Sequence, residues 1–98
     1  MAMHVGIARL ELHMAENGSL KAKRTVVKSV AQRVRNRFNV AVAEIDTQDV
    51  WELATLGIVC VSDDRRHSNE MLSKVVAFIE SERLDAEVGD VQMELIAV

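Results

Sequence analysis

Apolar and polar residues alternate in several segments of this chain and recur with helical spacing in two others. From His4 to Met14 the pattern predicts a strand, with alternating apolar positions at Ala8, Leu10 and Leu12. Val5 and Ile7 have the opposite parity. The segment therefore predicts either a bulge near Ala8 or a strand covered by apolar groups on both faces.

Helical spacing begins after a predicted turn over Glu16 to Ser19. Ser19 is a favourable N-cap, and the apolar residues beyond it recur about one helical turn apart: Leu20, Val27, Val30, Ala31, Val34 and Phe38. A helix is predicted from Leu20 to about Arg37.

The rest of the chain predicts a hairpin, a second helix and a last strand. A strand from Asn39 ends at the turn-forming side chains of residues 46–49, and a longer strand follows over residues 51–61. Ser62 to Asp64 offer caps for a helix that ends near Arg83, although this helix could begin as late as Ser68. Residues 88–98 alternate again as a strand.

The order strand, helix, strand, strand, helix, strand predicts an α+β, ferredoxin-like fold formed by residues 1–98 as one domain. In this fold a four-stranded antiparallel sheet carries both helices on one face. The other face is expected to be apolar, on the evidence of Val5, Ile7, Val40, Val42, Ile58 and Cys60. An open apolar face predicts a homodimer or another protein contact through the sheet.

Composition narrows the class of protein. The chain has 98 residues, of which 49% are hydrophobic and 28% charged, as in an ordinary globular domain. No apolar run approaches the roughly 18 residues that span a bilayer. The apolar pattern near the N-terminus is interrupted by charges, unlike a signal peptide. We therefore expect a cytoplasmic protein without a membrane partner.

Charge is distributed very unevenly along the sequence. Residues 17–43 contain seven basic residues and no acid, whereas the rest of the chain has five Lys and Arg against fifteen Asp and Glu. The seven form two shoulders of the first predicted helix: Lys21, Arg24, Lys28 and Arg35 on one side, and Lys23, Arg33 and Arg37 on the other. They are the candidate nucleic-acid-binding residues, because such an excess of cations suits a polyanion.

A solvated face is the alternative interpretation of these cations, with Glu80 and Glu82 of the second helix as possible ion-pair partners. Two glutamates cannot neutralise seven cations. Base stacking on the sheet, as in RNA-recognition-motif domains, is not expected, because Trp51 is the only aromatic residue on or near the predicted sheet.

Catalytic and metal-binding patterns are weak. His4, His13 and His67 have no metal-ligand spacing, and Cys60 is the only cysteine. The acidic residues Glu44, Asp46 and Asp49 are better explained as turn and edge residues than as an acid/base pair. We therefore expect no enzymatic activity, no catalytic residue, no metal and no cofactor.

Four segments agree in order and spacing with one known family. SLKAKR (19–24), RNRFNVAVAEID (35–46), WELATLGIVCVS (51–62) and VSDDRRHSNEML (61–72) resemble the YlxP-like family of small bacterial proteins of unknown function. The resemblance covers nearly the whole chain. It implies a ferredoxin-like fold and a gene found among translation genes, near those for initiation factor two and the ribosome-binding factor, and it brings no catalytic residue.

Two functions follow as hypotheses. In the first, the protein is a non-enzymatic accessory factor that contacts RNA, or the ribosome, through the basic first helix. In the second, it is a homo-oligomeric interaction module or a small-ligand-binding module that works through the open sheet face.

Overall fold

The fold contains four strands and two helices in the predicted order. The structure, a computed structural model, describes residues 2–15, 18–82 and 85–98. The elements are β1 (His4–Met14), α1 (Leu20–Arg37), β2 (Ala41–Glu44), β3 (Leu53–Ser62), α2 (Arg65–Ser81) and β4 (Ala86–Ala97).

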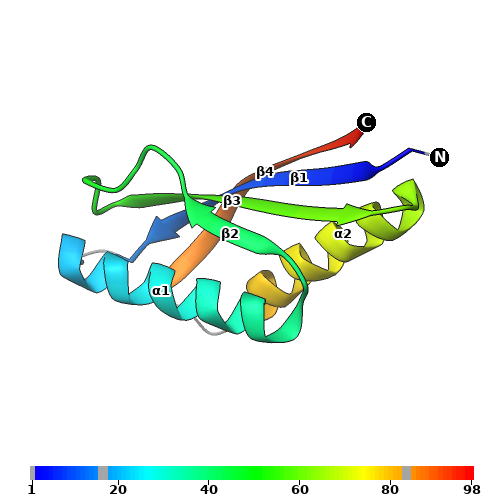
Figure 1. The fold of residues 1–98 in the computed structure, drawn as a ribbon. Helices are drawn as coiled ribbons and strands as arrows, with labels where there is room; N and C mark the ends of the chain where they lie inside the picture. Colours follow the sequence, from blue (N-terminus) through cyan, green and yellow to red (C-terminus); the bar gives the residue numbers. More distant parts are fainter. Residues whose placement is uncertain (1, 16–17, 83–84) are drawn as a thin grey trace.

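The strands form one antiparallel sheet in the order β2-β3-β1-β4. Figure 1 shows both helices against the same face of the sheet, with α1 and α2 placed end to end beneath it and the opposite face bare. This arrangement is the ferredoxin-like α+β fold that the sequence predicts. The β2 and β4 strands are the two edges of the sheet.

The core lies between the sheet and the helices. On β1 the side chains of Ala8, Leu10 and Leu12 are fully buried against the helices, where Leu72 and Val34 meet them in the core. Alternation along β1 is regular through Ala8, so the predicted bulge near this residue is wrong. The regular register agrees with the other alternative, a strand with apolar groups on both faces. The irregularity comes later, between Leu10 and Leu12, and only against β4.

Val5 and Ile7 lie on the open face because successive strand residues point to opposite faces. The same alternation shows that some of the apolar residues predicted for the open face lie on the core side instead. Ile58 pairs with Ala8 on the core side of the sheet, and Val42 pairs with Ile58, so both are buried in the core. Cys60 is buried on the same side, and Val40 packs partly buried against the core. The exposed apolar residues of β3 are instead Val59 and Val61.

Both helices begin at predicted caps. The Ser19 side chain accepts a hydrogen bond from the Ala22 amide of α1, and Asp64 accepts one from the Arg66 amide of α2. The second helix therefore starts at Arg65 rather than at Ser68. The predicted turn residues Glu16 and Asn17, and the predicted helix end at Arg83, lie outside the described residues.

Gly6 provides a test of how tightly α2 packs on the sheet. A Cβ atom at Gly6 would lie 2.9 Å from Leu72 Cδ1 and 3.0 Å from Cys60 Sγ, and both of these side chains are buried. Gly6→Ala is expected to lower the free energy of unfolding by about 1–3 kcal/mol, because the core must shift to admit the methyl group. Chemical denaturation with urea measures this loss.

Gly57 provides the matched control on the open face of the sheet. A Cβ atom there would meet mainly Ile45, at 3.1 Å from its Cγ1 atom, and this side chain is 37% exposed and can yield more easily than a core side chain. Gly57→Ala is expected to change the free energy of unfolding by less than about 0.5 kcal/mol. Equal losses for the two variants would contradict this description of the packing.

Candidate nucleic-acid interface

All seven candidate cations lie on α1, but the structure divides them into three groups. One ammonium group is buried in the interior, two guanidinium groups contact α2, and four side chains follow the side of the helix that faces β2. The groups differ in how far their charge is already compensated by the rest of the protein.

Lys23 is the buried member, with 1% of its surface exposed. Its Nζ atom lies 2.7 Å from Glu44 Oε2, and it also donates to the backbone oxygens of Thr47 and Leu53. The side chain therefore cannot contact an external polyanion, and the prediction that Lys23 belongs to a nucleic-acid-binding surface is wrong. A buried charge is stable only when paired and hydrogen-bonded in this way.

Helical spacing could have revealed this position. Lys23 precedes Val30 by seven residues and Val34 by eleven, and both spacings return to the same side of an α-helix. All three side chains are buried on the core face of α1. A lysine at a core position needs an acidic partner, and Glu44 is the first acid after the basic segment.

Arg33 and Arg37 contact the second helix. Arg33 Nη1 lies 3.6 Å from Glu82 Oε2, which confirms Glu82 as an ion-pair partner of the basic helix. The guanidinium carbon of Arg37 lies 5.0 Å from the centre of the Phe78 ring, within the range of a cation–π contact. Both side chains remain exposed, so these contacts compensate their charge only weakly.

The remaining four cations form a stripe on α1, which we call the basic stripe: Lys21, Arg24, Lys28 and Arg35. All four side chains are exposed. Among the described residues, no carboxylate lies within ion-pair distance of them. With a rise of about 1.5 Å per residue, the stripe extends roughly 20 Å along the helix.

A shallow groove of about 240 Å³ separates the basic stripe from β2. Arg24, Lys28 and Arg35 line it, while its floor is apolar and includes Val27 and Leu56. Glu44 also lines the groove, but its carboxylate is already bound by Lys23 and by the Thr47 hydroxyl. The groove therefore presents three cations beside one compensated acid.

Arg35 is held in place within this groove. Its Nη2 atom donates a hydrogen bond of 2.7 Å to the backbone oxygen of Val42, on the outer edge of β2. A guanidinium group has five N–H donors, so this bond orients the group and leaves other donors for a ligand. An arginine fixed in this manner loses less side-chain entropy when it binds a phosphate.

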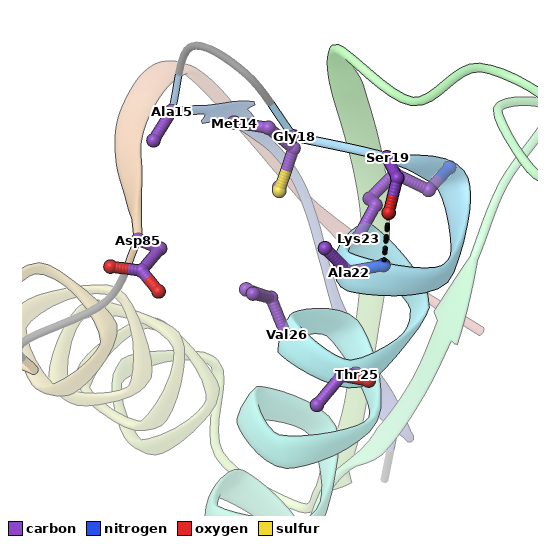
Figure 2. Close-up of a pocket in the computed structure, with 9 residues that line it drawn as sticks. All are labelled: Met14, Ala15, Gly18, Ser19, Ala22, Lys23, Thr25, Val26 and Asp85. Carbon is purple, nitrogen blue, oxygen red and sulfur yellow. Dashed lines mark hydrogen bonds between the residues drawn. The ribbon is translucent and has the colours of Figure 1, made fainter.

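A larger cavity, of about 490 Å³, lies at the N-terminal end of α1 (Figure 2). Figure 2 shows Met14 and Val26 on its apolar side, Asp85 across from them, and the Ser19 cap bonded to the Ala22 amide. Lys23 lines it with its stem, but its ammonium group is bound elsewhere. Most of the described residues that line this cavity are apolar or small.

The residues considered for catalysis are dispersed or engaged. His13 Nε2 lies 3.6 Å from Glu11 Oε1 on the open face of the sheet. In the described part of the chain, no three His, Cys, Asp or Glu side chains are grouped so as to hold a metal ion. Cys60 is a buried free thiol, in agreement with the small hydrophobic residue expected at this position.

Within residues 2–15, 18–82 and 85–98, no helix is long and apolar enough to cross a bilayer.

The fold and the basic helix together define a small ferredoxin-like α+β protein with a cationic helical edge. Residues 5–93 match the family model described as "Protein of unknown function (DUF503)", and the chain belongs to this family. It is similar to "Uncharacterized protein YlxP" of Bacillus subtilis (strain 168), with 43% identity over 77 residues, 79% of this chain and 84% of that protein. The resemblance to YlxP-like proteins is thereby confirmed.

Removing the buried ammonium group should destabilise the fold. Lys23→Met keeps an apolar stem but removes the only cation paired with Glu44 among the described residues, together with the lysine donor to the backbone oxygen of Thr47. The free energy of unfolding is expected to fall by about 3–5 kcal/mol, as for other buried pairs that lose one partner. Urea unfolding curves measure this change.

The double variant Lys23→Met/Glu44→Gln is the control for this interpretation. It removes the unpaired carboxylate as well, so it should recover part of the stability lost in the single variant. The single variant Glu44→Gln completes the comparison. If the double variant loses as much stability as the sum of the losses in the two single variants, the two side chains are not coupled.

Proposed function

We propose that this protein is a non-enzymatic, cytoplasmic accessory factor that binds RNA, free or within the ribosome, through the basic stripe. The observation that carries the proposal is the set of exposed cations at Lys21, Arg24 and Lys28, none of which has a carboxylate partner among the described residues. They are concentrated on one helix of a protein whose formal net charge is −3.

The electrostatic cost of placing cations at the start of α1 supports a functional role for the basic stripe. The first turn of α1 contains no acid, although acids are favoured there by the helix dipole. Lys21 and Arg24 lie near this positive end of the helix dipole, and no carboxylate of the described chain lies close enough to offset the repulsion. The presence of these two cations is explained if an external anion offsets their charge, and the phosphate backbone of RNA is such an anion.

The geometry favours contacts to the backbone of RNA rather than to particular bases. A single row of cations along one helix neutralises phosphates and positions a nucleic acid, but it cannot distinguish base edges. The resemblance to a family whose genes are found among translation genes supports ribosomal RNA as the target. Binding of this type weakens steeply as salt is raised.

The test is a charge reversal on the stripe. The triple variant Lys21→Glu/Arg24→Glu/Lys28→Glu should lose most of its retention on immobilised ribosomal RNA at low salt. Its thermal stability should stay close to that of the wild type, because acids near the start of α1 are favoured by the helix dipole. Retention is measured by elution with a salt gradient, and stability by thermal unfolding.

A second triple variant provides the matched control. Arg65→Glu/Arg66→Glu/Lys74→Glu changes the net charge by the same amount on α2, where all three residues are also exposed. Two of its three changes also lie in a first helical turn. This control should keep most of its RNA retention. Equal retention by the wild type and the α1 variant would refute the proposal, as would equal losses in the two variants.

A second candidate function uses the open sheet face, and a specific observation favours it. Val59 and Val61 are 40% and 61% exposed, and the pairing register places them beside Ile7 and Val5 on β1. Ile96 of β4 pairs with Val5 from the other side. The three strands therefore share one exposed apolar patch, which suits an apolar partner surface or a small apolar ligand.

This patch can be tested with a hydrophobic probe. Val59→Ser/Val61→Ser should lower retention on a phenyl column with only a small loss of stability, because both side chains lie on the open face and are 40% and 61% exposed. Val50→Ser, at an exposed apolar residue between β2 and β3, is the control and should have a smaller effect. Unchanged retention of the double variant would exclude this patch as a binding surface for apolar partners or ligands.

A further inference from the structure

The two edge strands of the sheet differ in whether their outer backbone groups are occupied. An edge strand presents a row of N–H and C=O groups that can pair with another chain, unless side chains or irregularities protect it. Here β2 and β4 are the edges, and they contain four and twelve residues. They can be compared group by group.

The outer edge of β2 is protected by side chains. The Ile45 amide bonds to the Thr55 oxygen, so alternation along the hairpin directs the backbone groups of Val42 and Glu44 outward. Their two carbonyl oxygens are already occupied. Arg35 Nη2 donates to the Val42 oxygen at 2.7 Å, and Gln48 Nε2 donates to the Glu44 oxygen at 3.0 Å.

The outer edge of β4 has no such protection in its second half. Met3 and Val98 exchange two hydrogen bonds, of 2.9 and 2.8 Å, and the register continues unbroken from this pair to Leu10 and Val91. Alternation therefore directs outward the backbone groups of Val91, Met93, Leu95 and Ala97. Among the described residues, no side chain donates to or accepts from them.

Only the first half of β4 carries the usual protection against pairing. The register against β1 shifts between Leu10 and Leu12, where β4 contains an extra residue near Gly89 and Asp90. A bulge of this kind disturbs an edge. From Val91 to Ala97 the strand is regular, and the side chain of Met93 is 41% exposed at its middle.

We propose that a second copy of this chain pairs with the β4 edge, antiparallel, about a twofold axis at Met93. An antiparallel strand pair is compatible with twofold symmetry, so one strand meets an identical strand and every contact occurs twice. The four strands of each copy then form one continuous sheet, in which the β4 strands are neighbours at the centre. This proposal does not depend on RNA binding.

The charges on β4 select the register of this pairing. Outward groups must meet outward groups, so the axis passes through a residue. Only the axes at Gln92, Met93 and Glu94 bring the exposed Met93 opposite a large apolar residue of the second copy, namely Val91, Met93 or Leu95. An axis at Glu94 places this carboxylate opposite itself, and an axis at Gln92 places Glu94 opposite Asp90 of the second copy. Like charges directly opposite each other on neighbouring strands are destabilising.

The axis at Met93 avoids both repulsions. It places Glu94 opposite Gln92 of the second copy on the open face, and Val91 opposite Leu95 of the second copy on the helical side. Val91 and Leu95 already pack against the core from their partly buried positions. Met93 meets its own equivalent, so the exposed apolar edge of each copy becomes covered by the other.

The experiment is sedimentation equilibrium of the full chain over a wide concentration range, with variants at Gln92. Wild type should show a concentration-dependent dimer. Gln92→Lys should form an attractive pair with Glu94 of the second copy at two symmetric positions and lower the dimer dissociation constant, by roughly two- to thirty-fold. Gln92→Glu should raise it by a similar factor.

Matched charge changes at Gln32, an exposed residue on α1, are the control. Gln32→Lys and Gln32→Glu change the net charge as much as the two Gln92 variants do, but Gln32 lies away from the sheet edge. Each should therefore change the dissociation constant by less than about twofold. Parallel shifts at the two positions would overturn the proposed register, because they would report net charge alone.

A backbone substitution tests the edge itself. Met93→Pro removes an outward N–H group that makes no bond within the monomer, so the monomer should keep its fold, whereas pairing through β4 should be lost. Circular dichroism verifies folding of this variant. If it does not fold, the Gln92 series still decides. A strictly monomeric wild type at high concentration, or a dimer that is insensitive to the Gln92 changes, would overturn the proposal.

Discussion

The buried ion pair between Lys23 and Glu44 is the constraint on which the geometry of the basic edge depends. It joins the end of the first turn of α1 to the end of β2, and the additional bonds to Thr47 and Leu53 extend the connection to the loop between β2 and β3 and to the first residue of β3. Burying an ammonium group costs several kcal/mol unless its partners are well placed. The helix therefore cannot rotate about its axis without losing these partners.

This anchoring explains how one of the cations at the start of α1, Lys23, is tolerated. Lys23 is compensated through the interior of the protein rather than by acids in its own helix. Its fixed direction turns Lys21, Arg24 and Lys28 toward solvent beside β2, and Arg35 completes the row with its bond to the Val42 oxygen. One side chain facing the interior thus determines where the remaining positive charge is presented.

Local periodicity predicts most of this fold, because apolar residues recur with the spacing of each strand or helix, and both helices have an N-cap residue in the sequence. The first helix has the predicted bounds, from Leu20 to Arg37, and the strand order follows from the sequence of elements. The charge asymmetry likewise identifies the helix that carries the basic stripe. These features depend on neighbours within a few residues, which a sequence displays directly.

Features that depend on pairing between distant segments could not be predicted as well. Which face of β3 is buried depends on its register with β1, and an offset of one residue exchanges Ile58 for Val59. The burial of Lys23 depends on Glu44, which is 21 residues away. Its helical spacing with Val30 and Val34 was a local signal for a core position, but only the fold brings the partner to it.

The sheet order relates the two proposed surfaces to each other. The basic stripe lies beside β2, and the open edge lies on β4, at the opposite side of the same sheet. In the proposed dimer the β4 strands meet at the centre, so the two stripes are placed at the two outer ends of the joined sheet. Two sites on one rigid support bind a long polyanion by avidity, because the second site engages at high effective concentration. A modest stripe of four cations on each copy would then suffice for a polymer such as RNA, whereas a short anion that reaches only one stripe would gain nothing from the pairing.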